Sequence, residues 1–284
     1  MEHLADGWSR EWLVGWRDVT DARASARTAV FSVLPLAGVG HTFPIALPHA
    51  EPAETAALVA NLAAFAFDYS ARQKVAGLHL TYGYLKQMPV LAPATYKCAS
   101  SFSTELLRDW LLLRVLELTY TAWDLVPFAH DCGWSGPPFR WDEERRFLLR
   151  CELDAAFFHL YLPAEESGDW RPADGETAAD LARLTASFPT PRDAVASIMD
   201  TFPIVRRKDE AKFDGDYRTR RVILEIYGAL AESTRSGQPY QTRLDPPPAD
   251  PRCCHPPRAA TPQHGHDGAA GTGAQQPTAL HNVS

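Results

Sequence analysis

The stretch DTFPIVRRKDEAKFDGDYRTRRVILEIY spans residues 200–227. Between Arg206 and Arg221 it holds seven basic residues and four acidic ones, a local excess of positive charge in a chain whose formal net charge is −7. Such a cluster can lie against phosphate groups. It can equally be a solvated helix–turn–helix junction with internal ion pairs, because charge runs are commonly exposed faces. The basic residues are Arg206, Arg207, Lys208, Lys212, Arg218, Arg220 and Arg221.

Helix signals lie on both sides of this cluster. An apolar period of 3.6 residues predicts a last helix that begins near Asp216 and ends before Gly237. Upstream, the motif TPRD at residues 190–193 combines a cap, a proline at the first helical position and a carboxylate in the first turn. It predicts a helix that runs to about Asp200 and leads into the basic cluster.

The middle of the chain is predicted to form two helices that pack as a hairpin. The first spans residues 103–121, with Ser103 as its cap. Asp142 is the predicted cap of the second helix, and Cys151 within it is interpreted as a small core residue rather than a nucleophile. The stripe of the first helix, apolar except for one arginine, comprises Leu107, Trp110, Leu111, Arg114, Val115 and Leu118.

The amino-terminal third is predicted to mix strands with a helix. Residues 8–48 indicate short strands, among them a buried strand and turn in TAVFSVLPLAGV at 28–39. Helical spacing predicts a helix over 54–68. Residues 67–93 combine basic, aromatic and glycine residues, which suits a loop that approaches a nucleic-acid backbone. The alternative is a turn before a core strand, in which His79 is a satisfied polar residue.

Three extended phrases carry a family resemblance. They are FDYSARQKVAGLHLTYGYLKQMPVLAP at 67–93, WDEERRFLLRCELDAAFFHLY at 141–161, and the stretch at 200–227. The last two resemble the carboxyl-terminal end of large adenine-specific DNA methyltransferases, which occur as type IIG-like restriction–modification enzymes and as phage-defence methylases. The first is similar to the end of their target-recognition domain. The resemblance covers about residues 8–162 and 195–233.

The resemblance implies that double-stranded DNA is the partner of this chain. The candidate contacts are chosen by residue type. One set is expected to contact a groove or the DNA backbone, and the other set is expected to contact phosphates. The predicted groove or backbone contacts are Arg72, Lys74, His79 and Tyr82. The predicted phosphate contacts are Arg206, Arg207, Lys208, Lys212, Arg218 and Arg221.

The motifs of methyl transfer are missing from the sequence. Adenine methylation needs an Asn/Asp-Pro-Pro-aromatic loop, whose first residue accepts a hydrogen bond from the target amine while the aromatic ring stacks on the flipped base. Gly-Pro-Pro-Phe at 136–139 lacks the acceptor, and Asp-Pro-Pro-Pro at 245–248 lacks the aromatic ring. Gly-Val-Gly at 38–40 lacks the third glycine and the helix start of a cofactor loop.

We therefore expect no catalytic residue and no cofactor in this chain. S-adenosylmethionine is expected in a methyltransferase catalytic domain or subunit elsewhere, which makes this chain a truncated or split product. A serine nucleophile elbow, a His-Glu-x-x-His helix and a phosphate loop are also missing from the sequence.

Composition sets further limits. Five cysteines give no disulfide framework and indicate a reducing cytoplasm. Charges interrupt the most apolar window, residues 106–118, so no membrane span is predicted. Residues 237–284, rich in Pro, Gly, Ala, Gln and His, are predicted to be disordered. No metal site is expected, because no standard zinc spacing is formed by Cys253, Cys254, His255, His264 and His266.

The sequence thus predicts an α+β protein, in which a mixed α/β recognition domain precedes a helical domain and a disordered tail. The predicted units are a target-recognition-like α/β domain at 1–97, a helical hairpin at 98–162, an irregular linker at 163–190, a helical module with the basic cluster at 191–236, and the tail at 237–284.

Two main functional hypotheses follow. One is the DNA-recognition part of an adenine-specific DNA methyltransferase or restriction–modification enzyme. The alternative is a helical docking module that binds a partner subunit without DNA contact, through Leu107, Trp110 and Leu111. A degenerate gene fragment without a stable activity is a third possibility.

Overall fold

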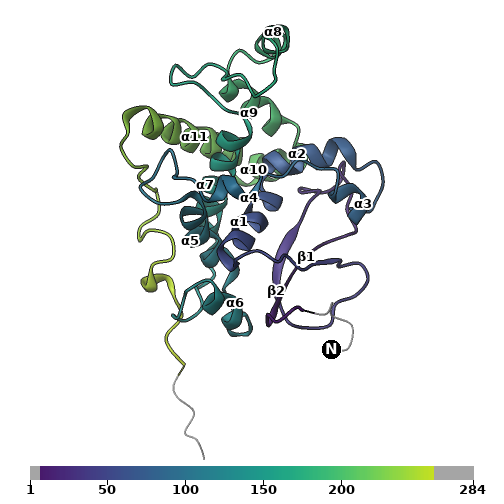
Figure 1. The fold of residues 1–284 in the computed structure, drawn as a ribbon, viewed down its shortest axis with the longest axis vertical. Helices are drawn as coiled ribbons and strands as arrows, with labels where there is room; N and C mark the ends of the chain where they lie inside the picture. Colours follow the sequence, from purple (N-terminus) through teal and green to yellow (C-terminus); the bar gives the residue numbers. More distant parts are fainter. Residues whose placement is uncertain (1–6, 259–284) are drawn as a thin grey trace, which may run out of the picture.

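The computed structural model describes residues 7–258, and within them it confirms the α+β class (Figure 1). A small antiparallel sheet lies at one side of the molecule, and helices fill the rest (Figure 1). The strand order is β2-β1-β3. The strands are β1 (Trp12–Trp16), β2 (Phe31–Pro35) and β3 (Ile45–Ala46).

The central strand β1 is buried at all five positions. A Cβ atom on Gly15 would lie 2.3 Å from the ring of Phe43 and 2.6 Å from the carbonyl oxygen of Pro44, so only glycine lets the chain after residue 40 approach this closely. The ring of Trp12 packs edge-on against Phe128, with 5.1 Å between centroids. This contact attaches the sheet to the helical part of the molecule.

The helices vary from four to nineteen residues in length. Two short 3-10 turns, Trp123–Leu125 and Pro251–Cys253, accompany them. The helices are α1 (Pro52–Ala63), α2 (Phe65–Lys74), α3 (Tyr82–Leu85), α4 (Pro93–Tyr96), α5 (Leu107–Thr119), α6 (Val126–Asp131), α7 (Glu143–Tyr161), α8 (Ala178–Ser187), α9 (Pro191–Asp200), α10 (Pro203–Lys212) and α11 (Arg218–Ser236).

Two of the predicted helix caps are confirmed and one is wrong. Asp142 accepts from the backbone N–H of Arg145, and Thr190 forms a capping box with Asp193. Ser103, in contrast, lies four residues before α5 and accepts from the N–H of Glu105. The preceding chain is held in a narrow turn by a backbone hydrogen bond from Ser100 to Glu105, which delays the start of the helix.

Residues 67–74 belong to α2, so the interpretation of this stretch as a loop or a turn is wrong. It contains neither glycine nor proline, and the loop-forming residues come only after Lys74. The carboxylate of Asp68 also fixes α2 against the chain before β2, because it accepts from the N–H groups of Thr28 and Ala29 at 2.9 and 3.1 Å.

One main core runs through the helices and reaches the sheet. Helix α1 packs between β2 and α5, and α7 packs against α2, α5 and α11 (Figure 1). This core is continuous across the positions near 97 and 190 where the sequence predicted unit boundaries. Its members include Trp12, Phe65, Trp110, Phe157, Val195 and Ile223.

The disordered tail predicted from residue 237 onward is wrong for residues 237–258, which run along the helical body (Figure 1). The hydroxyl groups of Tyr240 and Thr242 donate to the buried carboxylate of Glu152 at 2.9 and 2.6 Å. The guanidinium of Arg145 donates to the carbonyl of Pro246 at 2.8 Å. A segment with little apolar surface is therefore ordered by polar groups that the helices hold. Residues 259–284, with His264 and His266, lie outside the described residues.

Glu152 also pairs with Arg114 on α5, with 2.8 Å between Oε2 and Nε, and both side chains are buried. We expect Glu152→Gln to destabilise the protein by about 3 kcal/mol, because it leaves the guanidinium buried without a counter-charge. Urea unfolding measures the change. Glu232→Gln, which breaks an exposed pair with Arg235, is the control and is expected to cost less than about 1 kcal/mol. Equal costs for the two variants would contradict this assignment.

A half-buried histidine makes stability depend on pH. His159 stacks on the ring of Tyr227 and donates to its carbonyl oxygen at 2.8 Å, and burial lowers the pKa of His159 from 6.5 to about 4. Protonation then favours the unfolded chain, so stability is lost as the pH falls from about 6.5 to about 4, by ~2 kcal/mol at pH 5. His159→Gln removes this loss, and unfolding of both proteins at pH 7 and pH 5 measures the difference. Parallel pH profiles would exclude this role.

Candidate nucleic-acid interface

The basic cluster forms a helix–turn–helix unit from α10 and α11. The turn contains Gly215 at a φ of +86°, a backbone conformation that favours glycine. The carboxylate of Asp209 on α10 accepts from the N–H of Thr219 at 2.6 Å and so satisfies a free donor at the start of α11. The two helices therefore hold each other at a fixed angle.

Four of the seven arginines and lysines in the cluster are paired with carboxylates. Arg218 reaches across to Glu144 at the start of α7, and its guanidinium lies 4.3 Å from the ring centre of Phe147. The predicted phosphate contacts Arg206, Arg218 and Arg221 are thus engaged within the protein. The other pairs are Arg206 with Glu210 at 2.7 Å, Arg220 with Asp200 at 3.4 Å, and Arg221 with Asp216 at 2.7 Å and Glu225 at 2.9 Å.

The remaining cations are Arg207, Lys208 and Lys212, which are exposed on α10 and form no ion pair within residues 7–258. Lys208 and Lys212 are four residues apart and lie on the same side of the helix. Two acidic residues of the cluster, Asp209 on α10 and Asp214 in the turn, form no ion pair in the described chain, and Asp209 accepts only from the N–H of Thr219. The cluster thus leaves a net positive edge on α10.

Arg72, one of the predicted DNA contacts, is engaged within the protein. Its guanidinium donates to the carbonyl oxygens of Ala22, Ser25 and Ala26 at 2.6, 2.8 and 3.0 Å. It also lies 4.3 Å from the ring centre of Phe202. Burial lowers the pKa of Arg72, and the neighbouring Asp68 opposes this shift. Arg72 therefore fixes the loop before β2 onto α2.

The other residues predicted in this phrase lie on the surface beyond Arg72. Lys74 is exposed at the last position of α2. The Nδ1 atom of His79 lies 2.7 Å from a carboxylate oxygen of Asp18. The hydroxyl of Tyr82 donates to a carbonyl oxygen at 2.7 Å, and its ring packs edge-on against Trp16. Only Lys74 among the four has no partner of this kind in the described chain.

Two of the three phrases that carry the resemblance, those at 67–93 and 200–227, meet at Phe202. This fully buried residue lies between α9 and α10, and its ring packs on Phe65 of α2 with 4.6 Å between centroids. Arg72 lies against the same ring. Segments more than one hundred residues apart in the sequence therefore form one continuous part of the molecule.

Neither of the two loops that imitate a methyltransferase motif can stack on a base. Phe139 is fully buried, and its ring packs on Trp134 with 4.8 Å between centroids. Its N–H donates to the carbonyl of Tyr120. Within residues 245–248, the carbonyl oxygens of the first two prolines accept from Arg145. Both loops have structural roles.

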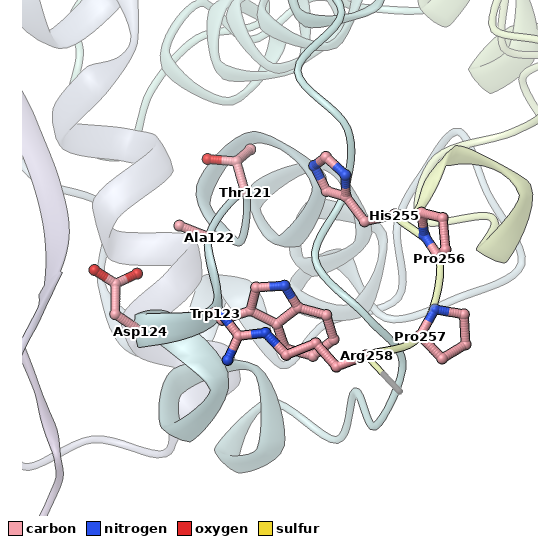
Figure 2. A pocket seen from close by; sticks show the side chains of 8 residues that line it. All are labelled: Thr121, Ala122, Trp123, Asp124, His255, Pro256, Pro257 and Arg258. Carbon is pink, nitrogen blue, oxygen red and sulfur yellow. The ribbon is translucent and has the colours of Figure 1, made fainter. Parts of the chain in front are cut away.

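A cleft lies between residues 121–124 and the segment 255–258 (Figure 2). Arg258 lies over the ring of Trp123, 4.7 Å from its centre. Figure 2 shows the imidazole of His255 and the carboxylate of Asp124 at opposite ends of the lining, so they do not form an acid–base pair. Arg258 is the last described residue.

Residues 7–258 contain neither a cluster of metal ligands nor a membrane-spanning helix. In this part of the chain no three side chains of His, Cys, Asp or Glu come together as a metal site. No helix in the same range has the length and apolar character needed to cross a bilayer. The buried thiol of Cys151 has a pKa raised by burial, which fits its interpretation as a core residue.

Comparisons with protein-family models, with curated proteins and with solved structures found no match to this chain.

The two cations of α2 differ in their surroundings, because Arg72 donates to backbone carbonyl oxygens and Lys74 is exposed. Replacing each one separately shows which of them stabilises the fold. We expect Arg72→Gln to lower the free energy of unfolding by about 2–3 kcal/mol, because three partly buried carbonyl oxygens lose a charged donor. Lys74→Gln, the matched control on the exposed end of the helix, is expected to change it by less than about 0.5 kcal/mol. Urea unfolding measures both. An Arg72→Gln protein of unchanged stability would restore this side chain as a candidate ligand contact.

Proposed function

We propose that this chain is the DNA-recognition part of an adenine-specific DNA methyltransferase or type IIG-like restriction–modification enzyme. It acts in the cytoplasm and binds the duplex so that a catalytic domain or subunit can flip and methylate an adenine. The observation that carries the proposal is the positive edge of α10, where Arg207, Lys208 and Lys212 are unpaired and outnumber the two unpaired carboxylates of the cluster. The resemblance of the surrounding phrases supports DNA as the polyanion.

S-adenosylmethionine is assigned to that catalytic partner, because the residues here do not fit it. The Gly38-Val39-Gly40 segment follows β2 in an exposed loop, and the next helix, α1, starts only at Pro52. A methyl-donor site needs a glycine-rich turn that leads directly into a helix. The role of this chain is therefore to bind and orient DNA.

The binding chemistry is electrostatic. Arg207, Lys208 and Lys212 can each neutralise one phosphate and release its counterions, which makes affinity fall as salt rises. Lys74 is a further exposed cation on the adjoining α2. Contacts by Arg206, Arg218 and Arg221 would require that they leave carboxylate partners, so we give them a positioning role.

The surface that the docking hypothesis requires is buried in the structure. Leu107, Trp110 and Leu111 are 3%, 4% and 0% exposed, because α5 packs against α1 and α7. An apolar face that is already covered within the chain cannot bind a partner subunit.

The proposal is tested by a triple variant, Arg207→Gln, Lys208→Gln and Lys212→Gln. We expect duplex DNA binding, measured by fluorescence anisotropy, to weaken, and the slope of log affinity against log salt to become shallower by about 2–3, since each phosphate contact contributes about 0.9. The side chains are exposed, so the fold should be retained.

The control triple variant is Arg171→Gln, Arg183→Gln and Arg235→Gln, which removes the same charge from exposed positions on other segments. It is expected to leave the salt slope unchanged. If both triple variants lower affinity equally, net charge alone explains binding. If the unmodified protein shows no salt-dependent DNA binding, the proposal is wrong.

A further inference from the structure

A second cavity lies between β2, α1, α5 and the start of α7. Its volume is about 400 Å³, within the range of small-molecule sites. The floor is aliphatic, whereas the rim carries three arginines and an indole. Residues of the floor include Val33, Val59, Val115, Leu118 and Leu153. The rim is formed by Arg27, Trp141, Arg146 and Arg150.

The positive charge of the rim is only partly compensated. Arg27 pairs with Asp154 at 3.1 Å, and that carboxylate also accepts from the N–H of Phe65. Arg146 and Arg150 form no ion pair within the described chain. They are one helical turn apart on α7, a spacing at which like charges repel. The pocket therefore carries two guanidinium groups without a carboxylate in ion-pair contact, and Glu143 and Glu117 act on Arg146 from a greater distance.

One nitrogen of the Arg146 side chain also lacks a hydrogen-bond acceptor. One of its terminal nitrogens donates to the carbonyl of Leu118 at 2.8 Å, but its Nε atom is buried without a hydrogen-bond partner. Burial and the neighbouring Arg150 lower the pKa of Arg146. A buried donor without an acceptor is costly, and an anion bound beside the two guanidinium groups would relieve the repulsion between them.

The aromatic part of the rim is Trp141, which is 60% exposed. Its indole N–H donates to Glu143 at 2.7 Å, and the guanidinium of Arg146 lies 3.6 Å from its ring centre. The indole is thus held in place although it remains open to solvent. A rigid exposed ring of this kind can stack on a planar ligand.

We propose that this pocket binds a nucleoside monophosphate, with the phosphate at Arg146 and Arg150 and the base between Trp141 and the aliphatic floor. Ser32, Thr119 and Thr121 line the cavity and offer hydroxyl groups to the sugar or the base edge. The pocket does not include the exposed cations of α10, so this site goes beyond the proposed DNA contact.

Isothermal titration calorimetry of the full chain with adenosine 5′-monophosphate tests the site. Adenosine and ribose 5-phosphate are the matched half-ligands. We expect the monophosphate to bind more than about tenfold more tightly than either, because only it uses both the cations and the apolar floor. Equal binding of ribose 5-phosphate would overturn the base site, and equal binding of adenosine would overturn the phosphate site. No detectable binding of the monophosphate would overturn the proposal.

Two variants test where the ligand binds. Arg150→Gln and Trp141→Leu are each expected to weaken binding about tenfold. Arg192→Gln, an exposed arginine on α9, is the control and is expected to bind as the unmodified protein does. Because Arg150 is exposed, thermal unfolding of its variant should be unchanged. Tight binding that both pocket variants retain would show that the nucleotide binds elsewhere, which contradicts the assignment.

Discussion

The carboxylate of Glu152 is fully buried at the centre of the helical packing, and the arrangement of three segments depends on how its charge is compensated. One oxygen faces Arg114 of α5, and the other accepts from the hydroxyls of Tyr240 and Thr242. A buried carboxylate is tolerated only when both oxygens are satisfied. The segment after α11 is therefore part of the core, although its composition resembles a flexible tail.

A second pair follows the same rule. Glu117 of α5 binds Arg145 of α7 at 2.7 Å, and its other oxygen accepts from the N–H of Ala249 at 2.9 Å. The internal use of charge also explains the surface. Arg218 and Arg220 of the basic cluster fix α11 to α7 and α9, and the unpaired cations on α10 form the edge that can meet a polyanion. The same reasoning identifies the pocket at Arg146 and Arg150, where neither guanidinium forms an ion pair in the described chain.

The sequence predicted the features of the fold that depend on local patterns. Helix caps at Asp142 and Thr190 follow from short-range hydrogen bonds, and the α+β class follows from the periodicities. It could not predict which arginines are engaged, because Glu144 and the carbonyl groups that hold Arg72 are remote in the chain. Backbone acceptors carry no residue signal at all. The sequence did not predict the pocket either, because its lining comes from elements that are remote in the chain. Trp141, followed by Arg146 and Arg150, was a visible signal of it.

The central claim is that α10 presents its unpaired cations to DNA. The chain has five lysines, so amine labelling followed by mass spectrometry reads each position separately, with and without duplex DNA. The account predicts that Lys208 and Lys212 lose reactivity when DNA is added, while Lys86 and Lys97 keep theirs. Unchanged labelling of Lys208 and Lys212 in the presence of saturating DNA would contradict it.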